Sequence, residues 1–364
     1  MIDTNKETII SKQGIYLVAI FTLGTSIILS GVPIAKQDIW LSLLIAFFSF
    51  IPLVFIYSKI LSFFPGKNLF EILEICFGKI VGKILSSLYV SYFFFLGALV
   101  IRDITEFIQV ASLRLTPQYF SGLMIILVGV YNVRSGFQVT GRLANFAFNF
   151  ILFLLTIIFA ASITKLDFTN LLPVLYRGWS PIIENSIILF AFPFGDIVIF
   201  LALFNNLKDQ KKTSKVLFTG ISISALLLLL NFIRSIAILG FPMAANVYFP
   251  VYYANTFLRF DNILENMGIF SAIILLLSGL GKYITCLFAA CIGLKHIFNS
   301  KNYKSYALPV GFLTLITSQL LFSSTMELMD HVKVYPYQVI PLQVPLPLII
   351  LIFSWRKSRK YRKS

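Results

Sequence analysis

One apolar stretch of the sequence contains several residues that weaken a helix. It runs from residue 21 to residue 40, FTLGTSIILSGVPIAKQDIW, and contains in order Gly24, Thr25, Ser26, Ser30, Gly31 and Pro33. Within a membrane, backbone groups freed from a helix are tolerated only where protein or a cavity surrounds them. A break at Gly24 would expose the amides of Thr25, Ser26 and Ile27, whose partial positive charge suits a carboxylate. We therefore expect one half of a ligand site here.

A second stretch, LFAFPFGDIVIF at residues 189–200, repeats the pattern with Pro193, Gly195 and Asp196. A break here would leave the carbonyls of Ala191 and Phe192 free to accept from an ammonium group, and Asp196 would add a full negative charge. A carboxylate near the bilayer centre costs about 2.5–3.5 kcal/mol on insertion scales, so it needs a function. The amides after Gly24 would form a positive end of the cavity, and the free carbonyls with Asp196 a negative end. Such a cavity fits a zwitterion, and a small amino acid is the simplest zwitterion. The side chains expected to wall its pocket are Phe190, Phe192 and Phe194.

The third residue of interest is Lys282, which lies within the apolar stretch SGLGKYITC beside Ser278 and Gly279. A fixed ammonium group there would take the place of a coupling cation or would pair with Asp196. Two alternatives stay open. Lys282 would instead extend its ammonium group to an interface, and Gly24 and Gly195 would only allow close helix packing.

The other charged residues give weaker signals. We expect a local ion pair with a structural role among Arg102, Asp103 and Glu106, which share one turn. Arg234, near a helix end, is interpreted as an interface charge, and His296 and His331 are interpreted as isolated, the latter in an outer loop. No metal-ligand spacing, phosphate-binding loop or nucleophile motif is found, so we predict no enzyme, no metal and no cofactor.

The amino-acid composition indicates what kind of protein contains these residues. The chain has 364 residues, of which 58% are hydrophobic and only 12% charged. Soluble chains carry about 25% charged residues, so the composition predicts an all-α, polytopic membrane protein in contact with the lipid bilayer. The net charge of +15 comes from Lys and Arg in short segments between apolar runs, which indicates membrane topology and not a nucleic-acid partner. Three cysteines predict no disulfide framework.

Apolar runs of about 20 residues predict ten transmembrane helices. They are expected at 13–35, 39–58, 84–106, 115–133, 143–164, 185–207, 216–240, 266–294, 305–326 and 334–355. The run 235–258 is interpreted as a helix end followed by an outer loop, with an eleventh span as the alternative. With ten spans, 21 of the 30 Lys and Arg residues fall on one side, which predicts that both termini are cytoplasmic.

Ten helices divide into two halves of five, and an odd number inverts the second half relative to the first. The sequence thus predicts a single domain with an inverted repeat, repeat one at about 12–164 and repeat two at about 180–355, followed by a basic cytoplasmic tail at 356–364. The two stretches with helix-breaking residues fall in helices 1 and 6, at the same depth. Between helices 2 and 3, Asn68 and Glu71 have capping-box spacing and predict a short amphipathic helix on the cytoplasmic surface or docked on the bundle.

Several short motifs along nearly the whole chain resemble those of one known family. They are the Gly24 to Pro33 segment with DIWLS at 38–42, Phe64-Pro65 with Asn68-Leu69, Gly78-Lys79, Arg102 with Thr116-Pro117, and PFGD at 193–196. The chain resembles the B subunit of the nutrient germinant receptor of bacterial endospores, a family in the amino acid–polyamine–cation transporter superfamily. The resemblance implies a leucine-transporter-like fold with broken helices 1 and 6, and a germinant site between helices 1, 3, 6 and 8. It also implies assembly with A and C subunits in the spore inner membrane.

By position in these motifs, the resemblance assigns the site to Gly24, Thr25, Ser26, Phe194, Gly195 and Asp196. The function that we expect is the sensing of a small amino acid-type germinant, which triggers spore germination together with the A and C subunits. The alternative is an amino acid permease of the cell membrane, with proton-coupled alternating access through Lys282 or Asp196. A structural scaffold with an unused cavity is the third possibility.

Overall fold

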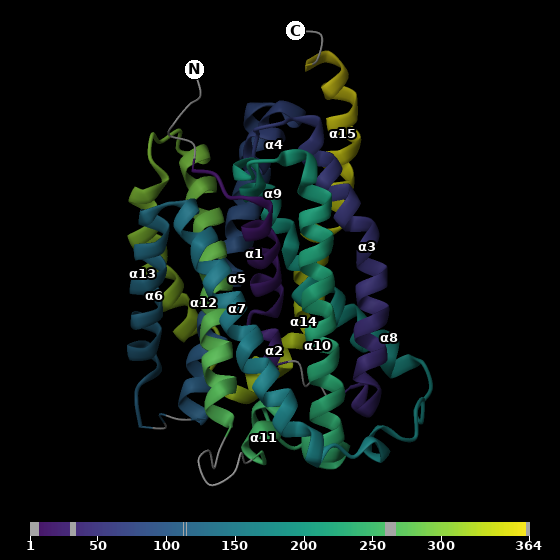
Figure 1. Cartoon of the computed structure of the whole chain (residues 1–364). Coiled ribbons are helices and arrows are strands. Elements are labelled where there is room, and N and C mark those ends of the chain that lie inside the picture. The colour runs from purple at the N-terminus through teal and green to yellow at the C-terminus, as the bar shows by residue number, and fades with distance from the viewer. Residues whose placement is uncertain (1–6, 30–33, 112, 114, 259–266, 362–364) are drawn as a thin grey trace.

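The computed structural model describes residues 7–29, 34–111, 113, 115–258 and 267–361, and it forms a bundle of helices (Figure 1). Seven helices in this part of the chain are long and apolar enough to cross a membrane. Each of these seven helices corresponds to one of the ten predicted spans, and the predicted spans at 13–35, 115–133 and 305–326 have no counterpart among them. The count of ten transmembrane helices therefore stays a prediction.

The α-helices are α1 (Ser11–Leu23), α2 (Ser26–Leu29), α3 (Ile39–Phe63), α4 (Leu69–Phe77), α5 (Lys79–Ala111), α6 (Gln118–Ser135), α7 (Phe137–Ser162), α8 (Ser180–Leu189), α9 (Phe200–Leu203), α10 (Thr213–Ala244), α11 (Pro250–Thr256), α12 (Gly268–Ile297), α13 (Ala307–Leu320), α14 (Thr325–Gln343) and α15 (Pro345–Tyr361).

The first helical segment is interrupted after Leu23. Gly24 has φ 35° and ψ −129°, a conformation that side chains other than glycine's rarely allow, and α2 starts two residues later at Ser26. The predicted opening at Gly24 thus coincides with a change of backbone direction. Ser30, Gly31 and Pro33, which belong to the same predicted stretch, lie outside the described residues.

The second interruption follows α8. Residues 190–194 form one turn of π-helix, within which Phe192 departs from helical geometry, with φ −136° and ψ 115°. Residues 195–199 then form a 3₁₀-helix that leads into α9. Pro193 removes a backbone donor at this point, which gives a local reason for the departure. Both interruptions lie inside the bundle, because α1 packs against α7, α10 and α12, and the 190–194 turn packs against α3, α8 and α14.

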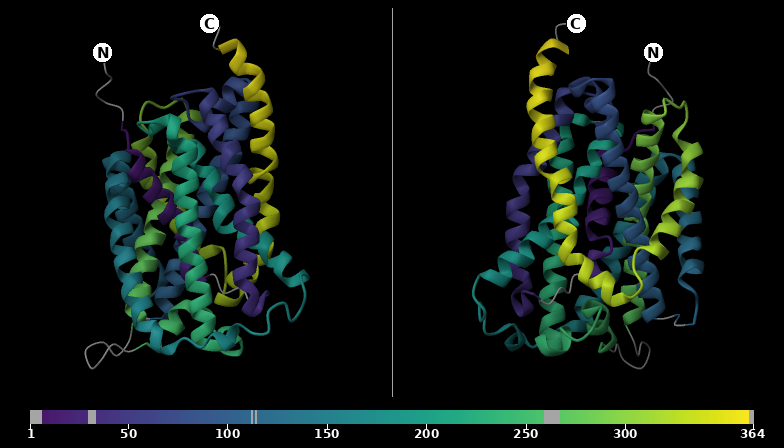
Figure 2. Two further views of the ribbon diagram at one scale, coloured as in Figure 1. Left: turned by 45° about the vertical axis from the view of Figure 1, so that its right-hand side comes forward. Right: turned by 180° about the vertical axis from the view of Figure 1, so that it is seen from behind.

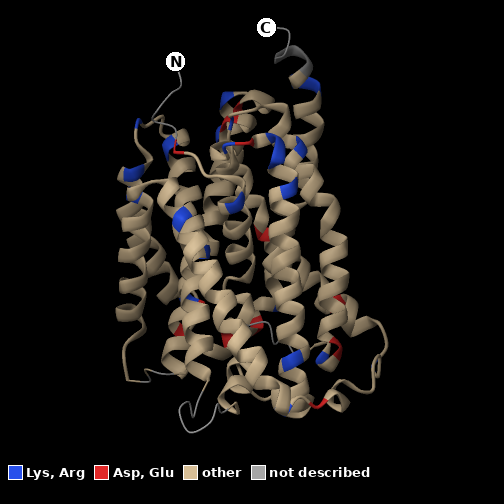
Figure 3. Cartoon of the chain, viewed as in Figure 1, with Lys and Arg blue, Asp and Glu red and all other residues tan. Residues whose placement is uncertain are grey.

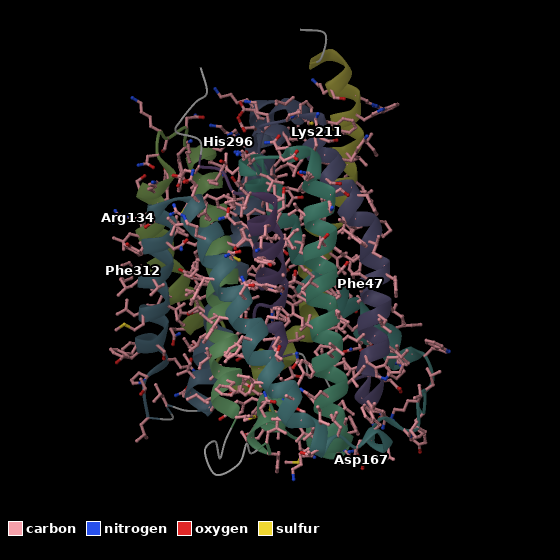
Figure 4. The ribbon with its side chains drawn as sticks, in the orientation of Figure 1. Phe47, Arg134, Asp167, Lys211, His296 and Phe312 are labelled. Carbon is pink, nitrogen blue, oxygen red and sulfur yellow. The ribbon has the colours of Figure 1, made fainter. Side chains whose placement is uncertain are left out.

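The start of α1 and the end of α15 lie at the same end of the bundle in all views (Figures 1 and 2). Lys and Arg gather toward this end, above the middle of the bundle in Figure 3. Figure 4 labels Lys211 and His296 near this end and Asp167 at the opposite one. The last residues of the predicted basic tail, 362–364, are outside the described part of the chain.

The predicted amphipathic helix is confirmed as α4. The Asn68 side chain accepts from the Glu71 amide at 3.0 Å, and the Glu71 carboxylate accepts from the Asn68 amide at 3.0 Å, which completes the capping box. Its apolar residues Leu69, Phe70 and Leu73 are buried, and the helix packs against α5 and α15. The helix is therefore docked on the bundle.

The run 235–258 is a helix end followed by irregular chain and a short helix. The backbone of α10 departs from helical geometry at Gly240, with φ 68° and ψ 156°, and the helix ends at Ala244. Residues 250–256 then form the short helix α11, which is far too short to cross a bilayer.

Candidate functional site

An ion pair lies at the centre of the bundle, between the two interruptions. The Lys282 ammonium from the middle of α12 is 2.7 Å from Oδ2 of Asp196, and both side chains are 0% exposed. The other carboxylate oxygen, Oδ1, accepts from the Tyr92 hydroxyl at 2.8 Å and from the Tyr335 hydroxyl at 2.7 Å. Lys282 therefore pairs with Asp196, which is one of the three interpretations of its position, and its ammonium group does not reach an interface.

Gln343, near the end of α14, connects this carboxylate to the second interruption. Its amide nitrogen lies 3.0 Å from the Ala191 carbonyl, 2.8 Å from the Tyr92 hydroxyl and 3.3 Å from Oδ1 of Asp196. A Cβ atom on Gly195 would come 2.1 Å from Oε1 of Gln343, so any other residue here would displace the Gln343 amide. The Ala191 carbonyl, which the sequence offers to a ligand ammonium, accepts from Gln343 in this arrangement.

The first interruption contacts the same ion pair from the other side. The Ser278 hydroxyl donates to the Gly24 carbonyl at 2.7 Å, and a Cβ atom on Gly24 would lie 2.6 Å from Cδ of Lys282. The Lys282 ammonium also lies 4.1 Å from the ring centroid of Phe192 and 5.1 Å from that of Phe21. These aromatic faces stabilise the cation within apolar surroundings.

Thr25 connects the first interruption to α5. Its hydroxyl donates to Oδ2 of Asp103 at 2.7 Å. Arg102 points elsewhere and pairs with Glu106 at 3.0 Å, with both side chains buried. The ion pair expected in this turn is present between Arg102 and Glu106, while Asp103 faces the interrupted helix.

A cavity of about 60 Å³ lies beside these groups, room for on the order of four water molecules. Ser26, Asp103 and Tyr335 are among its polar lining residues. The apolar lining comes from α5, α8, α10, α14 and the 190–194 turn: Leu96, Leu99, Val100, Ile188, Leu189, Phe192, Pro193, Leu228, Phe232, Leu328, Met329 and Val332. The remaining lining residue is His331.

Seven of the residues predicted for the site lie at the cavity or at the ion pair. Ser26 and Phe192 line the cavity, whereas Gly24, Thr25, Gly195, Asp196 and Lys282 surround the ion pair or its supports. Ile27 is buried outside the cavity lining. Of the three side chains expected to wall the pocket, Phe192 lines the cavity but Phe190 and Phe194 do not. Both of these rings pack against Phe50, with centroid distances of 5.5 and 6.1 Å.

Sequence reasoning missed three residues that hold Asp196, namely Tyr92, Tyr335 and Gln343. Tyr335 and Gln343 lie eight residues apart on α14, a spacing that places them near one face of a helix. That spacing is the only local signal, because nothing in the sequence states which helices lie against Asp196.

Two other predictions were wrong. Arg234 is not an interface charge, because it is 2% exposed and donates to Asn255 at 2.6 Å and to Ser162 at 3.2 Å inside the bundle. His331 does not lie in an outer loop, because α14 already starts at Thr325 and carries His331 to the cavity. His331 is helical because α14 starts nine residues before the predicted span at 334–355, and Arg234 is buried because α7 and α11 pack against it.

A larger, more polar cavity of about 600 Å³ lies at the end where α1 starts, lined in part by Glu7, Asn205 and His296. It is separate from the cavity beside Asp103, since the two share no lining residue. Among the described residues, no group of three or more His, Cys, Asp or Glu side chains has the arrangement of a metal site.

Comparison with known proteins decides the family. A family profile described as spore germination protein matches residues 8–326. The chain belongs to the spore germination protein family. Spore germination protein KB of Bacillus subtilis (strain 168) is 27% identical over 361 residues, covering 98% of this chain and 97% of the relative. The putative spore germination protein YfkT of the same organism is 25% identical, with 95% of this chain and 96% of the relative covered.

Two solved structures are similar to nearly the whole of this member of the spore germination protein family. MhsT in complex with L-phenylalanine has a TM-score of 0.68 at 13% identity, covering 95% of this chain and 91% of MhsT. Mhp1, a nucleobase-cation-symport-1 family transporter, has a TM-score of 0.67 at 13% identity, covering 95% of this chain and 78% of Mhp1. The likeness shows a shared fold of the leucine-transporter type, in a multi-pass membrane protein.

Proposed function

We propose that this protein is the B subunit of a nutrient germinant receptor. It senses a small amino acid-type nutrient at a mid-membrane site and triggers spore germination together with A and C subunits. The observation that carries the proposal is the fully buried Lys282–Asp196 pair, which lies between two helix interruptions beside a cavity. Membership of the spore germination protein family supports the biological role.

We propose ten transmembrane helices in one domain, residues 1–364, with inverted repeats at about 12–164 and 180–355 and a basic tail at 356–364. In this arrangement the two interruptions, at Gly24 and at Phe192, are the broken parts of helices 1 and 6. Short helices such as α6 and α13 then complete the spans that length and hydropathy leave out. The transporter fold of the structural neighbours supports the repeat.

We place both termini in the cytoplasm, on the inner side of the spore inner membrane. Positive residues favour the cytoplasmic side of a membrane, and Lys and Arg gather at the end where α1 begins and α15 ends (Figure 3). The cavity lining includes Leu328 and Met329 near the start of α14, toward the opposite end. A nutrient would thus reach the cavity from outside.

The site residues that we propose are Gly24, Thr25, Ser26, Ile27, Phe192, Phe194, Gly195 and Asp196, with Lys282 in the place of a coupling cation. Lys282 brings an ammonium group to the position between the interruptions, so the bundle needs no dissolved cation to hold Asp196. A nutrient that binds one arrangement of the bundle better than another shifts the equilibrium between them. The A and C subunits read that shift, and net transport is not required.

An amino acid permease is the second candidate function, favoured by the transporter fold of the neighbours. One experiment separates the two candidates. The gene is deleted in its own organism, and purified spores receive single nutrients while the fall in optical density is followed. Uptake of labelled amino acids by growing cells is measured in parallel. Lost germination with intact uptake supports the receptor, and lost uptake with normal germination identifies a permease.

A further inference from the structure

The buried charges around the first interruption pair off, with one exception. Of the carboxylates on α5 and in the second interruption, Asp196 has Lys282 at 2.7 Å and Glu106 has Arg102 at 3.0 Å. Asp103 is 8% exposed and has no cation within ion-pair distance among the described residues. A buried carboxylate without a counter-charge is costly, and a positive group bound beside Asp103 would offset that cost.

Asp103 has free capacity to accept such a partner. The Thr25 hydroxyl donates to Oδ2, and no other group in the described parts of the chain donates a hydrogen bond to this carboxylate. An ionised carboxylate offers about four acceptor positions, so most of them stay open. Since Asp103 lines the cavity, the open positions are accessible to a molecule bound there.

The rest of the cavity restricts the partner. Its wall is almost entirely aliphatic and aromatic, with only Ser26, His331 and Tyr335 as further polar lining side chains. Lys282 and Arg102 already have their own carboxylates, and the Arg234 guanidinium on α10 donates to Ser162 and Asn255. A ligand that fits this lining has one cationic donor group and a compact apolar body.

We propose that Asp103 binds the ammonium group of the ligand, which makes the nutrient a small primary amine such as an apolar amino acid. The inference rests on the proposed function and adds the residue that selects for the amine. It also replaces the Ala191 carbonyl as the ammonium acceptor, because Gln343 occupies that carbonyl.

Two substitutions separate recognition of the ligand from support of the helix interruption. Asp103→Asn removes the charge but keeps an acceptor for the Thr25 hydroxyl, whereas Thr25→Val removes the donor and keeps the charge. Asp209→Asn is the matched control, since the Asp209 side chain is 41% exposed, pairs with Lys212 at 2.9 Å and does not line the cavity. Protein levels in spore membranes are measured for each variant.

Spores of each variant and of a deletion strain receive the twenty amino acids, glucose, fructose and inosine singly. Asp103→Asn is expected to raise the half-maximal concentration of an amino acid nutrient by at least about tenfold, the loss of a hydrogen bond to a charged group. Thr25→Val is expected to raise it less, and Asp209→Asn not at all. An unchanged response in Asp103→Asn, or an equal shift in Thr25→Val, overturns the proposal.

Failure of the inference and failure of the proposed function look different. A deletion strain that loses only the response to glucose, fructose or inosine overturns the amine proposal and leaves the receptor function intact. A deletion strain that responds normally to every nutrient overturns the receptor function itself, and the amine proposal with it.

A second measurement does not depend on the folding of any variant. Thermal unfolding of the purified full chain is followed with L-alanine, ethylamine and propionate, and with L-valine, isobutylamine and isovalerate. We expect the amines and the amino acids to raise the midpoint and the two acids to leave it unchanged. The proposal is overturned if the acids raise the midpoint and the amines do not. It is also overturned if neither the amines nor the amino acids raise the midpoint.

Discussion

Replacing Lys282 by Met tests how the ion pair contributes to the stability of the bundle. The substitution keeps most of the apolar stem that packs against Gly24 but removes the ammonium group 2.7 Å from Asp196. Both side chains are completely buried, so Asp196 would be left as an uncompensated charge. Breaking a buried pair by removing one partner costs about 3–5 kcal/mol.

The remaining partners of Asp196 do not replace the lysine. The Tyr92 and Tyr335 hydroxyls both donate to Oδ1, and Oδ2 loses its only donor within the described structure. Asp196→Asn leaves the reverse situation, a buried ammonium group without a carboxylate. We expect it to lower the free energy of unfolding by a similar amount. The double variant Lys282→Met with Asp196→Asn has no buried charge at this position. We expect it to be more stable than either single variant, with a coupling energy of about 2–3 kcal/mol.

The assay is thermal unfolding of the four proteins in one detergent, followed by tryptophan fluorescence. At about 2 °C per kcal/mol, a loss of 3–5 kcal/mol lowers the midpoint by about 6–10 °C. Lys301→Met, an exposed loop lysine, is the matched control and is expected to change nothing. Single variants that unfold at the wild-type temperature, or a double variant whose loss equals the sum of the two, would refute the reasoning.

Three further substitutions test the surroundings of the site. Gly195→Ala places a Cβ atom 2.1 Å from Gln343 and should lower the unfolding midpoint by the equivalent of about 1–3 kcal/mol. The control Gly97→Ala, whose nearest contact would be 3.4 Å, should unfold at the wild-type temperature, and equal midpoints of the two variants would contradict this reasoning. Gly24→Ala and Gly178→Ala both strain a positive φ, but only the first meets Lys282, so it should be the less stable variant in the same assay. The Glu7 carboxylate accepts from the Phe137 amide and the Tyr303 hydroxyl, both at 2.7 Å, and Glu7→Gln weakens this acceptor. The variant should speed hydrogen exchange of the Lys208 amide, which donates to the Ile9 carbonyl; unchanged exchange would show that Glu7 does not hold the chain before α1 in place.

Residue type alone located the two helix interruptions and the two buried charges between them, because these signals are local. Gly24 and Pro193 have backbone properties that act within one turn, and the chain leaves helical geometry at Gly24 and Phe192. Asp196 and Lys282 stood out because charges are rare in apolar runs, and they pair in the structure.

The rest of the site depends on which helices lie together, which no local signal states. Tyr92 and Tyr335 come from α5 and α14 and are ordinary residues of apolar helices until the fold brings them to Asp196. Asp103 was interpreted with its neighbours in sequence, as part of an ion pair, whereas its contact is Thr25 in the interruption between α1 and α2. Arg234 was judged by its distance from a helix end, while its exposure depends on α7 and α11 packing over it.

The central claim is that the cavity between the interruptions receives the nutrient. Leu99, which is 8% exposed, lines it, and Leu88 on the same helix is 48% exposed on the outside of the bundle. The most direct measurement compares germination of spores carrying Leu99→Trp with spores carrying Leu88→Trp, at equal protein levels. If the cavity is the site, Leu99→Trp abolishes the response to the nutrient that deletion spores no longer sense, and Leu88→Trp preserves it. A wild-type response in Leu99→Trp spores would contradict the claim.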